Sequence, residues 1–147
     1  MANSISSSII IETNPSKIFA VLSDPRRHHE FDGSGSIVGS IDAPDQLKLG
    51  SKFAMNVKIG VKYPITNTVI EFTENEKIAW QHIGKHIWKY ELTDNGDNTT
   101  TVSETWDWSV CPYPERKGLE IAGFPKRNLK NIKKTLDNLK ILLENQS

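Results

Sequence analysis

The sequence predicts an α+β domain in which an antiparallel sheet covers a long C-terminal helix. Two patterns carry this prediction. Between residues 37 and 110, short runs of alternating apolar and polar residues are separated by turn-forming residues, which indicates consecutive β-hairpins. Beyond residue 125, apolar residues recur at helical spacing, which indicates one amphipathic helix. With 147 residues, the chain is long enough to form one domain, residues 1–147, around a sizeable core.

The chain is predicted to begin with a strand and two short helices. The strand runs from Ser4 to Glu12. Asn14 is suited to cap a helix that starts at Pro15, because proline fits the first helical position. Asp24-Pro25 ends this helix, since the residue before a proline avoids helical geometry. A second short helix is predicted from Arg26 to Glu30.

Six strands and a final helix are predicted in the rest of the chain. The last helix begins near Glu115 and is interrupted around Gly123-Phe124-Pro125, because glycine and proline break helices. Together with the opening strand, the hairpins make a seven-stranded antiparallel sheet. The predicted strands are Ile37–Ile41, Lys52–Ile59, Tyr63–Thr73, Lys77–Ile83, Ile87–Thr93 and Thr99–Val110.

Turn lengths predict how these strands are paired. A two-residue turn at Gly84-Lys85 would send Trp80 and Trp88 to opposite faces, whereas a three-residue turn, Ile83-Gly84-Lys85, places them opposite each other on one face. We adopt the second arrangement because a one-residue slip would expose a whole hydrophobic set. The predicted pairs are Phe53 with Thr68, Phe72 with Ile78, Ile70 with Trp80, Trp80 with Trp88, and Trp88 with Glu104.

Composition narrows the classes of function. The chain has 18 Lys plus Arg and 18 Asp plus Glu, so its net charge is zero, and no nucleic-acid partner is expected. Cys111 is the single cysteine, so no internal disulfide forms. No apolar run approaches the ~20 residues of a membrane span, and no signal peptide is evident. A cytoplasmic monomer or weak homodimer without a cofactor is therefore expected.

The strand from Thr99 to Val110 carries the most informative pattern for function. Its strict alternation places Glu104, Trp106 and Trp108 on one face. A purely packed face rarely contains a carboxylate, because a buried unpaired charge is costly. An aromatic face with one polar group is typical of a small-molecule cavity. Burial there predicts a raised pKa for Glu104, unless a hydrogen-bond donor stabilises its charge.

The aromatic residues that share this face are candidates for lining a ligand cavity between the sheet and the C-terminal helix. Ordinary core packing under the helix is the alternative for each of them. Phe124, at the helix break, is expected to reach the same cavity. The candidate ligand-binding residues are Phe53, Met55, Trp80, His82, Trp88, Tyr90, Glu104, Trp106, Trp108 and Phe124.

Glu104 and His82 are the candidate catalytic residues, as groups able to move a proton. The alternative for Glu104 is a structural carboxylate bonded to a neighbour such as Tyr90 or His82. His82 and His86 have the spacing of helical zinc motifs, but they lie across a predicted hairpin, and no metal site is expected. The pair His28-His29 is predicted to be a solvated surface feature.

Several segments resemble polyketide cyclase/dehydrase-like proteins of the START-like (SRPBCC, Bet v 1-like) superfamily. The resemblance covers nearly the whole chain, although Phe31 stands where these proteins more often have tryptophan. It implies a helix-grip fold, in which a seven-stranded sheet wraps the C-terminal helix around a cavity for hydrophobic molecules. The segments that carry it are Ile9–Glu12, Pro15–Arg27, Glu30-Phe31, Gly50–Phe53, Val69–Phe72, Lys77–Trp80, Tyr90–Leu92 and Thr99–Glu104.

Three functions remain open at this point. The first function is a non-catalytic carrier or sensor of a small hydrophobic or aromatic ligand, such as a lipid or polyketide; the resemblance covers carriers, sensors and cyclases and does not by itself decide among them. A cyclase or dehydratase using Glu104 or His82 is the alternative, but the inner face carries few titratable groups, which favours binding. The third function is a regulator that binds a protein partner through the basic C-terminal helix. The cations of that helix are Lys126, Arg127, Lys130, Lys133, Lys134 and Lys140.

Overall fold

The fold is described from a computed structural model, in which residues 3–33, 37–42, 46–59, 61–82 and 86–145 are placed. For residues 37–42, 55–59, 61–64 and 82 only the backbone is described. The elements in chain order are β1 (Ser4–Ile11), α1 (Pro15–Leu22), the 3-10 helix η1 (Pro25–Arg27), α2 (His28–Phe31), β2 (Ile37–Asp42), β3 (Lys52–Ile59), β4 (Val61–Thr73), β5 (Lys77–His82), β6 (Ile87–Asp94), β7 (Thr100–Asp107), α3 (Tyr113–Ile121) and α4 (Phe124–Glu144).

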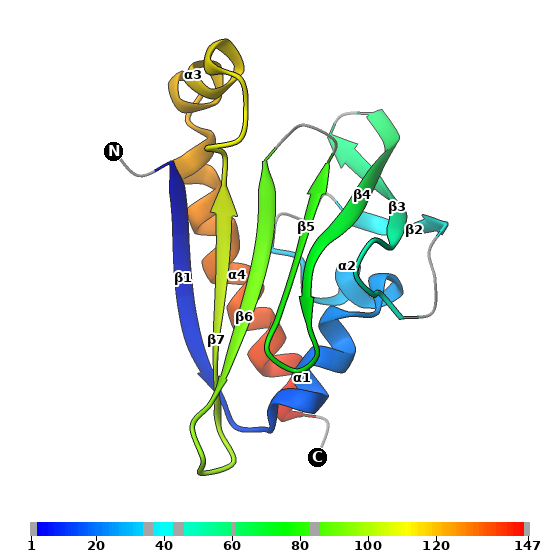
Figure 1. Cartoon of the computed structure of the whole chain (residues 1–147), viewed down its shortest axis with the longest axis vertical. Helices are drawn as coiled ribbons and strands as arrows, with labels where there is room; N and C mark the ends of the chain where they lie inside the picture. Colours follow the sequence, from blue (N-terminus) through cyan, green and yellow to red (C-terminus); the bar gives the residue numbers. More distant parts are fainter. Residues whose placement is uncertain (1–2, 34–36, 43–45, 60, 83–85, 146–147) are drawn as a thin grey trace.

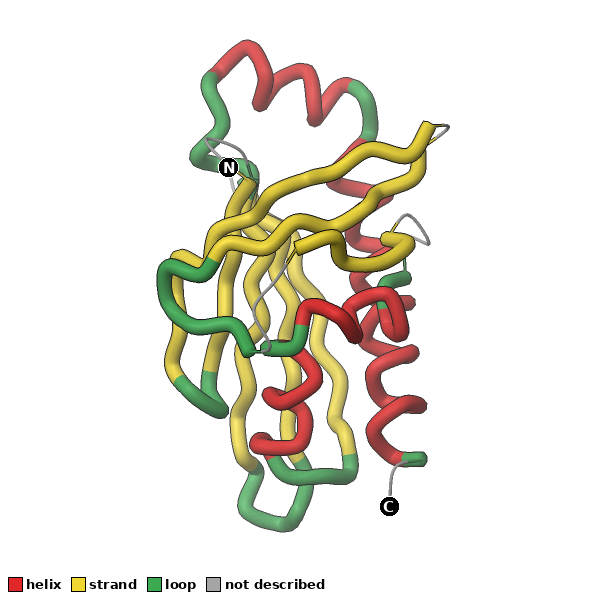
Figure 2. Tube along the Cα trace, turned by 90° about the vertical axis from the view of Figure 1, so that its right-hand side faces the viewer, coloured by secondary structure: helices red, strands yellow, loops and turns green. Residues whose placement is uncertain are grey.

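The strands form one antiparallel sheet in the order β1-β7-β6-β5-β4-β3-β2. Helix α4 lies along one face of this sheet, behind β1, β7 and β6 in Figure 1. The side view shows the sheet and α4 as two layers, with α1 and α2 beside them and β3 and β4 curving across toward α4 (Figure 2). The predicted α+β class and long C-terminal helix are confirmed. The helical details differ, because η1 separates the two short helices and α3 is distinct from α4.

Local capping explains the short helices. The side chain of Asn14 accepts a hydrogen bond of 3.1 Å from the backbone N–H of Lys17, and Pro15 occupies the first turn of α1. Asp24 caps η1 in the same way, by accepting a 3.1 Å bond from the N–H of Arg26. Both caps satisfy backbone donors that the first turn of a helix leaves without a partner.

The C-terminal helical region breaks where the sequence predicts. Gly123 has a φ of 81° between α3 and α4, and Pro125 follows in the first turn of α4. A left-handed φ is readily accessible to glycine, and proline does not need the backbone N–H that a helix start leaves free. The chain therefore changes direction here, and α3 becomes a separate helix at the end of the molecule (Figure 1).

The predicted strand pairing is partly confirmed. Trp80 lies opposite Trp88, as predicted, although the turn residues 83–85 lie outside the described residues. Phe72 lies opposite Ile78, also as predicted. Phe53 lies opposite Asn67, not Thr68, so this hairpin is offset by one residue from the prediction.

Two other predicted registers are wrong for identifiable reasons. A bulge between Val69 and Glu71 places Val69, not Ile70, opposite Trp80, so Val69 is buried and Ile70 is exposed. Between β6 and β7 the pairing differs by two residues from the prediction. The last pair before the turn joins Asp94 to Thr100, and Trp88 therefore lies opposite Trp106. Since a two-residue shift keeps each side chain on its face, the inward position of Glu104 is preserved.

Helix α4 is held against the sheet by an apolar stripe and against α2 by close backbone contact. Ile132, Leu136 and Leu139 are each 1% exposed or less. Gly33, which follows α2, donates its N–H to the hydroxyl of Thr135 over 2.7 Å. A side chain at Gly33 would place its Cβ 2.5 Å from a backbone oxygen of α4, so only glycine allows this approach. The contact fixes the segment next to it, which contains Asp32, beside the interior.

Candidate functional site

Glu104 is a buried carboxyl group in the middle of the inner face. It is 4% exposed, and β6 places Tyr90, which is 3% exposed, directly opposite it. The Tyr90 hydroxyl is hydrogen-bonded to this carboxyl group, whereas Glu104 Oε1 has no hydrogen-bond partner among the described residues. The predicted pairing with Trp88 is therefore wrong by two residues, and of the bonding partners considered for a structural Glu104 the structure has Tyr90.

The surroundings of Glu104 favour its protonated form. Burial raises its pKa to about 8, because the interior solvates a charge poorly. The hydrogen bond from Tyr90 lowers the pKa, whereas the negative charge of Asp32 raises it, and burial is the largest of the three effects. At neutral pH, Glu104 is thus mostly an uncharged group that can donate a proton. The pKa of Tyr90 is raised well above its usual value by burial and by Glu104.

His28 is a second buried titratable group, although the sequence predicted that it lies on the surface. It is 2% exposed, and its Nε2 lies 2.8 Å from the carbonyl oxygen of Leu22. That contact makes Nε2 the protonated nitrogen, so Nδ1 is an acceptor, and Nδ1 has no hydrogen-bond partner in the described structure. Burial lowers the pKa of His28 to about 4, so the ring is neutral at neutral pH.

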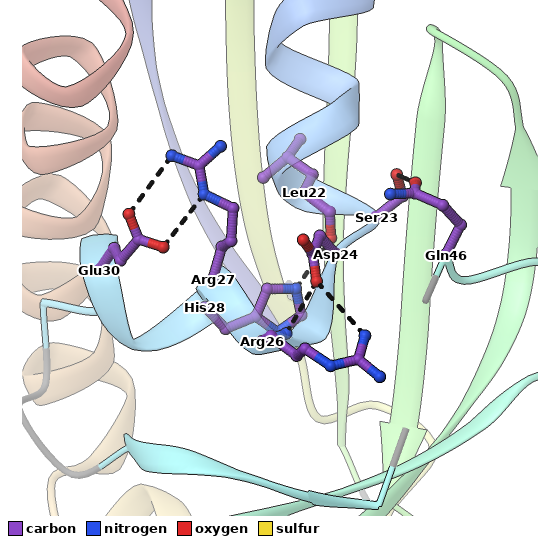
Figure 3. A network of polar contacts seen from close by, with 8 residues as sticks. All are labelled: Leu22, Ser23, Asp24, Arg26, Arg27, His28, Glu30 and Gln46. Carbon is purple, nitrogen blue, oxygen red and sulfur yellow. Dashed lines mark hydrogen bonds and ion pairs between the residues drawn. The ribbon is translucent and has the colours of Figure 1, made fainter. Parts of the chain in front are cut away.

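Ion pairs and hydrogen bonds hold the segment that carries His28 (Figure 3). Asp24 caps the backbone ahead of it, and Arg27 forms a salt bridge of 3.0 Å with Glu30. The hydroxyl of Ser23 donates to the carbonyl oxygen of Phe19 over 2.7 Å at the end of α1. These contacts hold the backbone on either side of His28, and the contact of Nε2 with the carbonyl oxygen of Leu22 orients the imidazole itself.

Aromatic rings surround His28. The imidazole stacks on Trp80 with ring centroids 4.9 Å apart and an angle of 20° between the planes. Phe31 and Phe53 approach it edge-on at 5.6 and 5.7 Å. Trp80 also contacts Tyr90, with ring centroids 5.7 Å apart. We call Glu104, Tyr90, His28, Trp80, Phe31 and Phe53 the central cluster.

Three tryptophans and a histidine form a second group toward the α3 end of β7. Trp106 stacks on Trp108 at 4.8 Å and contacts Trp88 at 6.2 Å and His86 at 5.3 Å. The indole nitrogen of Trp106 is buried and has no hydrogen-bond partner among the described residues. The indole N–H of Trp108 donates to Glu120 of α3 over 2.9 Å.

The predicted ligand-binding residues are thus divided between two places. Phe53, Trp80, Tyr90 and Glu104 belong to the central cluster, and Trp88, Trp106 and Trp108 belong to the second group. Phe124 is half-buried at the start of α4, with the Arg127 guanidinium 4.6 Å from its ring centre. The side chains of Met55 and His82 lie outside the described residues.

Sequence reasoning missed His28 and Phe31 as members of the central cluster and Asp32 as a charge that acts on Glu104. The available signal was the spacing of His28 and Phe31, which lie three residues apart and therefore share one side of a helical turn. Nothing local shows that this turn faces the core, because its position depends on the contact between Gly33 and α4.

The rest of the described structure adds two observations. In the described part of the chain, no group of three or more His, Cys, Asp or Glu residues is arranged to hold a metal ion. A recess of about 200 Å³ opens between β1 and α4, lined by polar and aliphatic side chains without an aromatic ring. Its lining residues are Ser7, Ser8, Ile9, Lys133, Leu136 and Asp137.

The described residues thus form an antiparallel sheet that holds a long C-terminal helix over a buried aromatic and polar centre. Residues 2–144 match the family described as polyketide cyclase / dehydrase and lipid transport, and the chain belongs to this family. The resemblance noted in the sequence is therefore confirmed.

Similar proteins extend this comparison. The chain is 36% identical over 138 residues to the uncharacterized protein Rv0088 of Mycobacterium tuberculosis. The aligned region covers 92% of this chain but only 62% of the length of that relative. The crystal structure of protein NE0264 from Nitrosomonas europaea matches with a TM-score of 0.71 at 15% identity, covering 97% of this chain and 95% of that one. A START superfamily protein from Mycobacterium smegmatis matches with a TM-score of 0.67 at 16% identity, covering 98% and 99%. At these identities the solved structures show the fold alone.

Proposed function

We propose that this protein binds a small, uncharged, hydrophobic molecule with a polar group at the central cluster, between the sheet and α4, and acts as a carrier or sensor. Family membership supports the hydrophobic character of the ligand. The aromatic rings around His28 supply an apolar and partly stacked wall, which is the usual lining of a small-molecule site.

One observation carries the proposal. Two polar atoms of the central cluster, His28 Nδ1 and Glu104 Oε1, are buried and have no hydrogen-bond partner in the described structure. Folded proteins satisfy the great majority of buried polar atoms, because each unpaired one costs about 1–3 kcal/mol. A ligand with a hydroxyl or carbonyl group would supply the missing partner and remove this cost.

The electrostatics of the cluster favour an uncharged ligand. Neutral His28 accepts a hydrogen bond at Nδ1, and protonated Glu104 can donate one. An anionic ligand would be repelled by Asp32, whose charge already acts on both Glu104 and Tyr90. A cation would have to lose its hydration in an apolar setting, which is costly.

A second function, of the cyclase or dehydratase type, has one specific observation in its favour. A carboxyl group with a pKa of about 8 can donate a proton near neutral pH, as a general acid must. In that function Glu104 would protonate a leaving hydroxyl or a carbonyl oxygen of the substrate. A Glu104→Gln variant that binds substrate normally but loses turnover by about 10²–10⁴-fold would support catalysis over carriage.

The binding proposal can be tested with a pair of probes that differ in one polar group. 2-Naphthol and 2-methylnaphthalene have nearly the same shape, but only the first can donate to His28 Nδ1. Each would compete with the fluorescent dye N-phenyl-1-naphthylamine for the purified protein. We expect 2-naphthol to bind more tightly by about 3–10-fold, the worth of one net hydrogen bond.

Variants of two neighbouring histidines provide the control. His28→Phe keeps an aromatic ring but removes Nδ1, so it should abolish the preference for 2-naphthol. His29→Phe lies in the same turn on an exposed residue and should keep the preference. The proposal is wrong if the wild-type protein binds neither probe, or if it shows equal affinity for both.

A further inference from the structure

Helix α3 is unusual in this fold because it buries none of its residues. It lies beyond the end of the sheet, at the top of Figure 1, and crosses the same end of the molecule in the side view (Figure 2). Apolar side chains are nevertheless present here. Ile121 is 80% exposed and Tyr113 is 65% exposed, whereas Val110, just before the helix, is 49% exposed. Three large apolar side chains are thus exposed on or just before a single nine-residue helix, which makes this end of the molecule a candidate for contact with a partner.

The first half of α4, which follows directly, is strongly basic. Between residues 122 and 136 the chain has five Lys or Arg residues and no Asp or Glu. The buried stripe of α4 contains Ile132 and Leu136, and the cations lie on the other side of the helix. The exposed cations of this half are Lys126, Arg127, Lys130, Lys133 and Lys134.

Cations and apolar groups are also neighbours in detail. The guanidinium of Arg127 lies 4.6 Å from the ring centre of Phe124, and that of Arg116 lies 5.7 Å from the ring centre of Tyr113. Glu120 of α3 is turned inward, where it accepts the indole N–H of Trp108 over 2.9 Å. The Lys117 ammonium lies 3.8 Å from the other oxygen of Glu120, so the charge of this carboxylate is partly balanced within α3.

We propose that α3 and the first three turns of α4 form a docking surface for an anionic lipid bilayer. An apolar tip bordered by cations is what the boundary between headgroups and acyl chains accommodates. Each Lys or Arg near an anionic leaflet attracts it, and the exposed isoleucine and tyrosine can enter the boundary region. The proposed contact is a peripheral one. In the described part of the chain, no helix is long and apolar enough to span a bilayer.

The exposed apolar side chains beside the cations favour a bilayer over an acidic protein as the partner at this surface. Ile121 and Tyr113 are largely exposed, and a flat, deformable boundary can take up such side chains without a matching pocket. Binding should therefore need both parts of the surface. Removal of either the apolar tip or the cations should release the protein.

Sedimentation with vesicles tests this proposal directly. The full chain would be mixed with vesicles of phosphatidylcholine alone, or of phosphatidylcholine with roughly one third phosphatidylserine. We expect the protein to sediment with the anionic vesicles but not with the neutral ones, and to be released by raised salt. Failure to sediment with either kind of vesicle would overturn the proposal.

Two matched pairs of variants separate its two parts. Ile121→Glu should weaken binding to anionic vesicles about tenfold or more, since it removes an apolar side chain and adds repulsion. Ile141→Glu changes another exposed isoleucine, 60% exposed near the far end of α4, and should leave binding unchanged.

The double change Lys126→Glu with Arg127→Glu should also weaken binding at least about tenfold, because two attractions become two repulsions. Lys17→Glu with Lys48→Glu alters net charge equally at exposed positions elsewhere and should have little effect. If the cation variants release the protein but Ile121→Glu does not, the surface recognises an acidic macromolecule by charge alone, and the bilayer proposal is wrong. The dye-displacement assay on the same variants reports the central cluster separately.

Discussion

Replacing Glu104 by glutamine should change how the stability of this protein depends on pH. Glutamine has nearly the same shape and can keep a hydrogen bond to Tyr90, but it cannot ionise. In the wild-type protein, burial raises the pKa of Glu104 to about 8 from an ordinary value of 4.5. The folded state therefore binds more protons than the unfolded state between these two pH values. Stability must fall as pH rises through this interval.

The size of the effect follows from the pKa values. Complete ionisation of Glu104 in the fold costs up to about 5 kcal/mol, at about 1.4 kcal/mol for each pH unit between the two pKa values. His28 acts in the opposite direction, since its pKa falls from 6.5 to about 4 and its contribution to stability rises with pH over that range. Between pH 6.5 and 8 the contribution of Glu104 falls by about 1.7 kcal/mol, and His28, half protonated in the unfolded state at pH 6.5, offsets about 0.4 kcal/mol of this loss.

Urea unfolding across pH 6.5 to 9 would measure this difference. We expect the free energy of unfolding of the wild-type protein to decline by about 1–1.5 kcal/mol from pH 6.5 to 8 and to level off above it, whereas that of Glu104→Gln stays nearly flat. Glu91→Gln, an exposed position on β6, is the matched control and should follow the wild type. Parallel curves for wild type and Glu104→Gln would refute the assignment of a raised pKa to Glu104.

Two further predictions concern packing. Gly33→Ala should destabilise the protein by about 2 kcal/mol in urea unfolding, because its Cβ would lie 2.5 Å from the Asn131 carbonyl oxygen. Gly118→Ala has open space around its Cβ and should stabilise the protein by up to about 1 kcal/mol. Equal effects of the two changes would contradict the close approach of Gly33 to α4. Trp108→Phe removes the hydrogen bond to Glu120 but keeps an aromatic ring. Hydrogen exchange of the α3 amides should therefore accelerate about 3–10-fold. Unchanged exchange would show that this bond does not hold α3 in place.

Much of the fold could be predicted from the sequence because its signals are local. The cap at Asn14, the break at Gly123 and the alternation along β7 each depend on residues within one or two turns of chain. Pairing was less predictable. The bulge near Ile70 and the two-residue offset of Glu104 depend on how a whole hairpin closes, and turn residues alone do not determine that.

The candidate site shows the same division. The inward position of Glu104 was predictable, because alternation decides which face of a strand a residue occupies, and it survived an error in register. The burial of His28 was not predictable, because a histidine beside another histidine and two arginines has the local pattern of a surface. Its place in the core comes from packing between segments far apart in the chain.

The sequence by itself determined the α+β class, the inward aromatic face and the carboxyl group on it, because the spacing of apolar residues decides which side chains must leave water. The tertiary structure alone decided which polar groups share the interior. Gly33 presses the end of α2 onto α4, and this contact brings Asp32 within electrostatic range of Glu104, Tyr90 and His28. The pKa values of these groups are shifted by burial and by charges from distant segments, so the shifts arise only when the chain folds.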